Sequence, residues 1–405
     1  MSKKHRKQRR SAQAVALSRD QPVALVRTHD QDQWPALTGL RGLAAFAVLC
    51  LHAYETAGKP VSVPQPFAWL FSIGWSGVDV FFTLSAFLLT LPYLRAEFDG
   101  AAAPRLGEYA WRRAVRILPA YYVQIAILLL LGALGIASSW AWNSPSLPRV
   151  LAHLLFYVDA WPTIQPQVPP WWTLPVEVGF YVLLPLFARL LRPGRWPWLL
   201  LAIAASLGYR FWLMHAGLNN GQAIDWVEHL PGRLHQFLIG MLAAYAYFRL
   251  KARSALPSAK SADLLAVAAT VLFLLLPAVG YLVSDRAFQG GPISNPLLLC
   301  WHFFASLVIG TLLIALLAGA PKMGRLFSSA PLRGLGLISY SLYLWHYPLM
   351  LGLRSELGGF AAIRSDFWPF YFYCVLISVS VAIASWWLVE RPAQQWGRRV
   401  ASARQ

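Results

Sequence analysis

Long apolar stretches separated by short polar connections run along most of the chain. A helix needs roughly 20 apolar residues to cross a bilayer, and ten stretches meet that requirement. We predict a transmembrane helix in each: residues 38–57, 68–94, 116–137, 172–191, 197–216, 233–250, 262–284, 297–318, 334–353 and 368–389. A further apolar stretch at 149–160 is too short to cross, so a half-buried or interfacial helix is expected there.

Composition excludes a set of soluble domains. Of the 405 residues 57% are hydrophobic and only 13% are charged, about half the charged share of a typical soluble domain. Too few polar side chains remain to cover the apolar ones. The predicted fold class is therefore all-α, a polytopic membrane helical bundle of about ten helices. We expect a disordered basic tail at 1–37, one membrane-embedded domain at 38–392 and a cytoplasmic tail at 393–405.

The positive charge is distributed as in a membrane protein. The net charge is +18, from 35 Lys and Arg against 17 Asp and Glu. Cytoplasmic loops of membrane proteins collect Lys and Arg. With both termini in the cytoplasm, 27 of the 35 fall on the inner side and five on the outer side. This asymmetry supports the ten-helix topology in the inner (plasma) membrane and removes the need for a nucleic-acid partner. The inner segments are 1–37, 95–116, 189–196, 249–260, 319–333 and 391–405.

Two polar residues stand out in the first predicted helix. Arg41 and His52 are eleven residues apart, which is three helical turns plus about 20°, so both point to one face. Their axial separation is about 16 Å. Arg41 as a snorkelling anchor and His52 as a satisfied core histidine are the structural alternatives. Ionisable groups within membrane segments are functional candidates because their desolvation is costly.

At these residues the chain resembles the acyltransferase-3 family of membrane O-acyltransferases, whose first helix carries an Arg or Lys, ten residues and a His. Other stretches match the family's order, although Ala86 and Val178 depart from its pattern, and Val178 removes a second carboxylate. The matching stretches are Gly77-Val-Asp-Val-Phe-Phe-Thr-Leu-Ser-Ala-Phe87, Trp111-Arg-Arg-Ala-Val-Arg116, Trp172-Thr-Leu-Pro-Val-Glu177, Ser339-Tyr-Ser-Leu-Tyr-Leu-Trp-His346-Tyr-Pro348 and Glu390-Arg-Pro392.

The resemblance implies transfer of an acyl group, usually acetyl, from cytoplasmic acyl-CoA to a hydroxyl of a carbohydrate. The residues suit this chemistry. A neutral imidazole at His52 can take the proton of the attacking hydroxyl, while an acyl-histidine intermediate is the alternative. Guanidinium groups bind phosphate bidentately, so Arg41, Arg113 and Arg116 are the candidate donor-binding residues. The alternative for Arg113 and Arg116 is ordinary positive-inside charge.

Two carboxylates complete the candidate site. We expect Asp79 to hold the imidazole of His52, since a carboxylate partner fixes the tautomer and raises basicity; a packing or capping role is the alternative. Glu177 either binds an acceptor hydroxyl or lies at the membrane interface. For His346, a structural hydrogen bond at a kink is favoured over catalysis. The 16 Å offset along the first helix would let the donor's pantetheine arm run from phosphates at Arg41 to a thioester near His52.

The absence of several motifs limits which cofactors and partners are expected. The chain has no HExxH, no Cys/His cluster and no GxxxxGK motif, so neither a metal nor a nucleotide loop is expected. The expected partners are the lipid bilayer and a glycan, lipid-linked saccharide or other hydroxyl acceptor; homo-oligomerisation is left open. The alternative class is a transporter or flippase that uses the same buried polar residues. A transporter has no need of the Arg113/Arg116 site.

Overall fold

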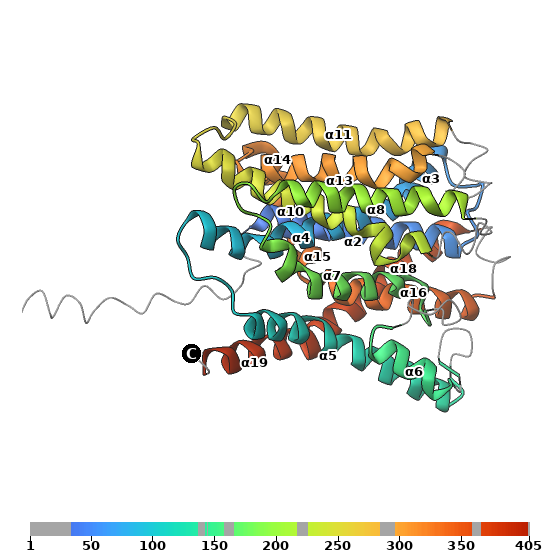
Figure 1. Cartoon of the computed structure of the whole chain (residues 1–405). Helices are drawn as coiled ribbons and strands as arrows, with labels where there is room; N and C mark the ends of the chain where they lie inside the picture. Colours follow the sequence, from blue (N-terminus) through green and yellow to red (C-terminus); the bar gives the residue numbers. More distant parts are fainter. Residues whose placement is uncertain are drawn as a thin grey trace, which may run out of the picture.

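The computed structural model describes residues 34–136, 142–143, 145–157, 166–216, 226–283, 296–358 and 366–403, where it forms helices and no strand (Figure 1). The elements are α2 (Pro35–Thr56), α3 (Gln65–Ser72), η1 (Ile73–Ser76), α4 (Gly77–Phe98), α5 (Leu106–Ala133), α6 (Leu147–Leu154), η3 (Pro169–Trp172), α7 (Thr173–Ala188), α8 (Pro197–His215), α10 (Leu230–Ala252), α11 (Ala259–Val283), α13 (Pro296–Leu317), α14 (Pro321–Phe327), α15 (Ala330–Leu337), α16 (Ser339–Glu356), α18 (Phe367–Ser385), η4 (Trp386–Glu390) and α19 (Arg391–Ser402).

A helix overlaps each of the ten predicted spans. Within the described ranges, seven helical segments are long and apolar enough to cross a membrane. The other three predicted spans correspond to α8, whose apolar part is shorter, and to α10 and α16, whose sequences are more polar. The all-helical fold class is confirmed, and the count of ten crossings stays a prediction. The short apolar stretch at 149–160 overlaps the helix α6 (Leu147–Leu154), and its residues 158–160 lie outside the described part of the chain.

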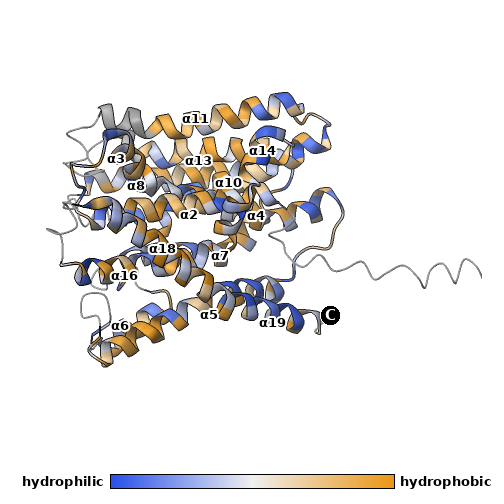
Figure 2. Cartoon of the chain, turned by 180° about the vertical axis from the view of Figure 1, so that it is seen from behind, coloured by the Kyte–Doolittle hydropathy of each residue, from blue (hydrophilic) through white to orange (hydrophobic). Residues whose placement is uncertain are grey.

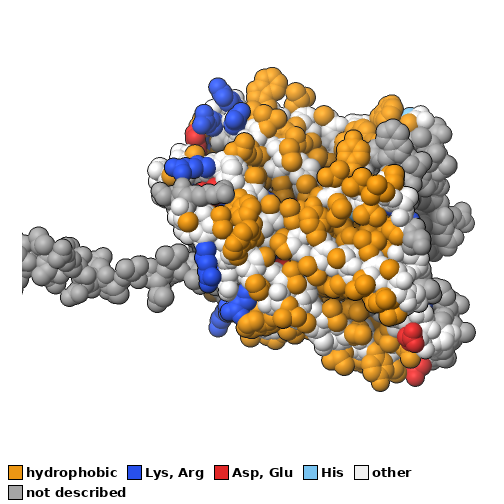
Figure 3. Space-filling model, turned by 90° about the horizontal axis from the view of Figure 1, so that it is seen from below, with side chains coloured by type: hydrophobic (Ala, Val, Ile, Leu, Met, Phe, Trp, Pro, Cys, Tyr) orange, Lys and Arg blue, Asp and Glu red, His pale blue; other side chains and the backbone are white. Residues whose placement is uncertain are grey.

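The surface is apolar where the helices run and polar at their ends. Figure 2 shows hydrophobic residues along the middle of the bundle, and Figure 3 shows Lys and Arg gathered at one end of an otherwise hydrophobic face. Val182, Leu264 and Leu388 are 74%, 70% and 77% exposed. A soluble monomer rarely exposes so much contiguous apolar surface. The described part therefore has the surface of a multi-pass membrane protein.

Helix α2 lies inside the bundle because glycines let its neighbours approach. It packs against α4, η1, α15 and α16. A methyl group added at Gly39 would lie 1.6 Å from the Phe327 carbonyl oxygen, and one at Gly42 would lie 2.2 Å from that of Leu332. From the other side, a methyl group at Gly336 would meet the Thr38 carbonyl oxygen at 2.0 Å. Backbone contact at this distance holds the helix that carries Arg41 and His52 in a single position.

Two predicted boundaries differ in the structure. The span expected at 68–94 is divided into α3, the 3₁₀ turn η1 and α4. The basic residues before the third span already belong to a helix, because α5 begins at Leu106. Most of the predicted cytoplasmic tail at 393–405 belongs to the helix α19, which packs on α5 through a hydrogen bond from Trp111 Nε1 to the Gly397 carbonyl oxygen at 3.0 Å; its side of the membrane stays a prediction. Helical backbone hydrogen bonds continue through polar residues. A helix can therefore be longer than the apolar stretch within it.

The membrane orientation makes a direct prediction. Reporters fused at the C-terminus and within 251–260 should both report the cytoplasm, because Lys and Arg collect there. A reporter at Asn219-Asn220, which lies outside the described residues, should report the opposite side. Alkaline phosphatase and fluorescent-protein fusions measure this. A C-terminal reporter active on the outer side would require an odd number of crossings.

Candidate active site

Arg41 lies on α2 among charged side chains from two other helices. Its electrostatic neighbours include Arg116 and Arg113 of α5 and Glu177 of α7. Arg41, Arg113 and Arg116 are all partly exposed rather than sealed in the core. The structure thus brings together the three arginines that the sequence proposes as a phosphate-binding set. Three guanidinium groups at one place repel one another unless anions lie between them.

The two arginines of α5 point inward, and their neighbour in sequence does not. Arg113 and Arg116 are at i and i+3, which places them on one helical face. Arg112 is exposed and forms an ion pair with Glu108, one turn earlier on α5. The Trp111-Arg-Arg-Ala-Val-Arg116 stretch therefore divides into one exposed cation and two partly buried cations that are electrostatic neighbours of Arg41.

Glu177 is tied to the same group of residues. Its carboxylate accepts hydrogen bonds from Ser85 Oγ of α4, at 2.9 Å, and from the Tyr181 hydroxyl one turn along α7. Both Glu177 and Tyr181 are electrostatic neighbours of Arg41. Glu177 is only partly buried. The observed position thus places this carboxylate beside the arginines, inside the bundle and away from its lipid-facing surface.

A second carboxylate, Glu390, approaches the arginines from η4. It is 2% exposed, and Ser341 Oγ of α16 donates a hydrogen bond to it. Arg116 and Arg41 are among its electrostatic neighbours. The Glu390-Arg-Pro392 stretch therefore contributes a counter-charge to the basic cluster. Two carboxylates against three guanidinium groups leave the cluster with excess positive charge.

His52 occupies the other end of the same helix and meets α16. Its Nδ1 lies 2.8 Å from Nε2 of His346, and the two rings meet edge to edge, with centroids 5.0 Å apart and ring planes inclined by 22°. Tyr347 contacts the His52 ring edge-on, at 5.2 Å between centroids. His52 is partly exposed, whereas His346 is 1% exposed. One ring is thus accessible and the other lies behind it.

Asp79 does not hold His52, contrary to the expectation from sequence. Its carboxylate accepts a 2.7 Å hydrogen bond from His302 Nδ1 and a 3.2 Å bond from Trp301 Nε1, both on α13. Gln236 Nε2 donates to the same carboxylate, and an Arg233 guanidinium nitrogen lies 3.6 Å away. Asp79 points to α10 and α13, both of which pack against α4.

Asp79 and the side chains that bind it are buried more deeply than the arginine cluster. Asp79 is 0% exposed and Arg233 is 4% exposed. Arg233 also pairs with Glu228 and lies over the Trp172 ring, 5.3 Å from its centroid. Every polar partner is thus paired within the bundle, as buried charges require. This arrangement indicates a structural junction of α4, α10 and α13.

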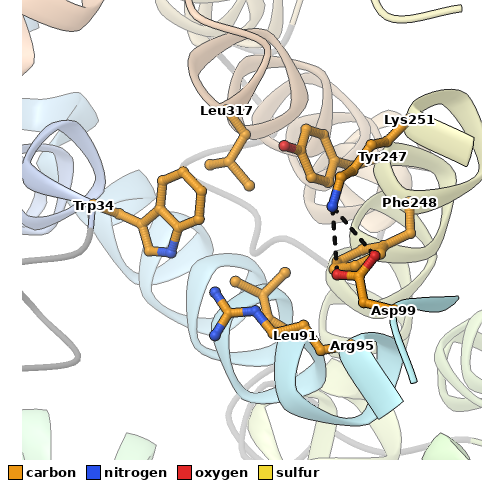
Figure 4. A pocket seen from close by; sticks show the side chains of 8 residues that line it. All are labelled: Trp34, Leu91, Arg95, Asp99, Tyr247, Phe248, Lys251 and Leu317. Atoms are coloured by element: carbon orange, nitrogen blue, oxygen red, sulfur yellow. Dashed lines mark hydrogen bonds and ion pairs between the residues drawn. The ribbon is translucent and has the colours of Figure 1, made fainter. Parts of the chain in front are cut away.

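A pocket of about 210 Å³ opens at the basic end, near the start of α2 (Figure 4). Its cations are Arg95 and Lys251, and Lys251 Nζ lies 3.3 Å from each carboxylate oxygen of Asp99. Asp99 offsets part of the charge, and none of the three arginines of the cluster lines this pocket. The lining residues are Trp34, Leu91, Arg95, Asp99, Tyr247, Phe248, Lys251 and Leu317.

Comparison with known proteins places this arrangement in a family. A family model described as an acyltransferase domain matches residues 34–387, most of the chain and both ends of the site. The chain belongs to the acyltransferase-3 family. The resemblance seen in the first-helix Arg and His is confirmed. No solved structure matches the chain.

Curated relatives of this acyltransferase-family chain are O-acetyltransferases. The peptidoglycan O-acetyltransferase OatA of Listeria monocytogenes is 27% identical over 342 residues, which cover 78% of this chain and 49% of that protein. The O-acetyltransferase OatA of Staphylococcus aureus is 26% identical over 390 residues, which cover 89% of this chain and 58% of that protein. The chain thus spans about half the length of the curated relatives it matches.

Sequence reasoning undervalued two histidines of this acyltransferase-family chain. His346 was expected to make a structural bond at a kink, but it also contacts His52 across 294 positions of sequence. His302 has no recognisable pattern around it, and it proves to be buried and bonded to Asp79. For His346 the Ser339–Pro348 stretch was an available signal, whereas nothing in sequence marked His302. Among the described residues, no group of three or more His, Cys, Asp or Glu side chains could hold a metal ion.

Proposed function

We propose that this protein is a membrane O-acyltransferase that moves an acyl group, normally acetyl, from cytoplasmic acyl-CoA to a hydroxyl of a cell-envelope glycan. The observation that carries the proposal is the pairing, on α2, of a basic cluster at Arg41 with an accessible imidazole at His52. Family membership and relatives named as O-acetyltransferases support it. The plasma (inner) membrane is the proposed location.

The two ends of α2 have different proposed roles. Arg41, Arg113 and Arg116 bind the donor's phosphates, which supply the negative charge that the cluster lacks. His52 lies about 16 Å further along α2. A donor anchored at the arginines can therefore place its thioester at His52 only through an extended arm, and coenzyme A carries a long pantetheine arm. The acyl group crosses most of the bundle while the nucleotide stays at the basic end.

The transfer itself needs one base. His52 takes the proton of the acceptor hydroxyl as its oxygen attacks the thioester carbonyl. A carbon–oxygen bond forms, the carbon–sulfur bond breaks with its electron pair going to sulfur, and the proton passes from the imidazolium to the thiolate. The products are the O-acyl glycan and free coenzyme A. Water competes with the acceptor, so the enclosure of His52 by α16 also limits hydrolysis of the donor.

The carboxylates have different proposed roles from those the sequence indicated. Glu177 orients the basic cluster, since Glu177 and its partner Tyr181 are both electrostatic neighbours of Arg41. Its contact with Ser85 and Tyr181 fixes its position. Asp79 organises α4, α10 and α13. Neither carboxylate takes a proton from the acceptor in this scheme.

The experiment that tests the proposal is a transfer assay with the purified protein in liposomes. Acetyl-CoA and soluble peptidoglycan fragments, the acceptor class of the relatives, are supplied together. We expect free thiol to appear in proportion to fragments that gain one acetyl ester, identified by mass spectrometry. A transporter would move fragments across the liposome without consuming the thioester. Thiol release that never yields an ester, with these and with other glycans, would contradict acyl transfer to a carbohydrate.

Replacing Arg113 by Ala should weaken donor binding and leave the chemistry intact. A charge-assisted hydrogen bond contributes about 1.5–3 kcal/mol, equivalent to a tenfold to hundredfold loss of affinity. Calorimetry with acetyl-CoA and the KM for the donor measure this. Arg112→Ala is the matched control, because Arg112 is exposed and pairs only one turn away, with Glu108. Equal donor affinity in the two variants would remove α5 from the donor site.

A further inference from the structure

His346 makes hydrogen bonds at both of its ring nitrogens. Nδ1 lies 3.0 Å from the Leu342 carbonyl oxygen and 2.8 Å from that of Tyr343, both on its own helix α16. Nε2 lies 2.8 Å from Nδ1 of His52 on α2. The ring is 1% exposed, so no acceptor or donor substrate reaches it. His346 can therefore affect acyl transfer only through His52 or through the fold of α16.

The partners determine where the protons are. A carbonyl oxygen only accepts hydrogen bonds, so Nδ1 of His346 carries a proton. In a neutral imidazole the other nitrogen then holds a lone pair. Nε2 of His346 is therefore an acceptor, and Nδ1 of His52 must be the donor. This leaves the lone pair of His52 on its own Nε2, the nitrogen that does not face His346.

We propose that His346 is a positioning residue that selects the Nδ1–H tautomer of His52, so that Nε2 of His52 is the base. This inference rests on the proposed acyl transfer. The tautomer matters because a base whose lone pair faces a buried neighbour cannot take a proton from a substrate. Two fixed carbonyl oxygens of α16 thus determine, through one intervening ring, which nitrogen of His52 is basic.

The His52–His346 hydrogen bond also stabilises the His52 imidazolium that forms during transfer. After His52 accepts the hydroxyl proton, its Nδ1–H still donates to Nε2 of His346, and a bond from a charged donor is stronger than a neutral one. The hydrogen bond to His346 and the edge-on Tyr347 ring restrict rotation of His52. Helix α16 is itself anchored, because the Tyr343 hydroxyl bonds Thr173 Oγ1 at 2.7 Å. The imidazolium is therefore held while its proton moves to the thiolate.

Two substitutions at 346 separate positioning from a purely structural role. Asn places its amide where Nδ1 lies, so His346→Asn keeps the bond to the α16 carbonyls and loses the acceptor for His52. Gln reaches the position of Nε2, so His346→Gln keeps an acceptor for His52. We expect kcat to fall roughly 10- to 100-fold in His346→Asn and His346→Ala, and only a few-fold in His346→Gln, since orientation of a base affects the chemical step. The KM for acetyl-CoA should change less than twofold.

The same assay distinguishes failure of the positioning role of His346 from failure of the proposed acyl transfer. Asn with wild-type kcat, or Asn more active than Gln, would overturn the positioning role and leave acyl transfer by His52 intact. Full activity in His52→Ala would instead overturn the proposed function. Should the variants fail to fold, ¹⁵N-histidine NMR of the wild-type protein in detergent decides the matter directly. The expected result is a protonated Nδ1 and an unprotonated Nε2 in the resonances that His52→Ala removes, and the reverse pattern would refute the inference.

Discussion

His52→Ala is expected to reduce acyl transfer by roughly 10²- to 10⁴-fold, the usual contribution of a general base. Donor binding should stay within about twofold of wild type, because a base acts in the transition state and the arginines lie about 16 Å away along α2. Turnover with peptidoglycan fragments and calorimetry with acetyl-CoA measure the two effects. The variant should still insert, since Ala is well tolerated in a helix.

A matched control comes from a histidine on another helix. His215 is exposed at the end of α8, where its Nδ1 lies 3.1 Å from the Phe211 carbonyl oxygen. His215→Ala should leave both turnover and donor affinity unchanged. Loss of donor binding in His52→Ala with normal binding in Arg113→Ala would show that the donor lies along α2 in the opposite direction.

Asp79→Ala should destabilise the folded protein by about 3–5 kcal/mol, the cost of removing one member of a buried ion pair. The substitution leaves Arg233, His302 and Trp301 without the carboxylate that they share. Thermal unfolding in detergent, followed by intrinsic fluorescence, measures the loss. Asp79→Asn should also destabilise, because its amide nitrogen would face these donors.

Asp99, the C-cap residue at the other end of α4, provides the comparison. Its side chain is 41% exposed, and its bond to Lys251 lies at the bundle surface. Exposed ion pairs contribute about 0–1 kcal/mol, so Asp99→Ala should shift the unfolding temperature little. A stable Asp79→Ala protein that loses turnover selectively would return Asp79 to the catalytic group.

The positions of the clustered arginines could be predicted in part from their spacing in the sequence. The spacing of Arg113 and Arg116 identifies their common face, and the structure turns that face to Arg41 while Arg112 points outward. Helical geometry is local, so residue numbers place Arg116 on one face with Arg113, but equally with Arg112 at i and i+4. Only the structure shows that Arg112 instead pairs with Glu108. Glu390 illustrates the limit, because its approach to Arg41 depends on how α18 and η4 return to the bundle.

Asp79 shows where spacing misleads. It follows the first helix closely in sequence, and a carboxylate is the usual partner of a catalytic imidazole. Yet α4 turns this side chain to α13, 223 positions away at His302. The side chain that does meet His52 is a histidine. The residue type of Asp79 suggested that it binds His52. Only the tertiary structure showed that it binds another histidine, His302.

The sequence by itself determined the helical membrane class, the location of the apolar helices and the common face of Arg41 and His52, because hydrophobic period and helical rise depend on neighbouring residues. The tertiary structure alone decided which side chains meet between helices. The His52–His346 contact joins residues 294 positions apart, and it depends on the packing of α16 against α2. Such contacts follow from the shapes of whole helix surfaces, which no short pattern of residues specifies.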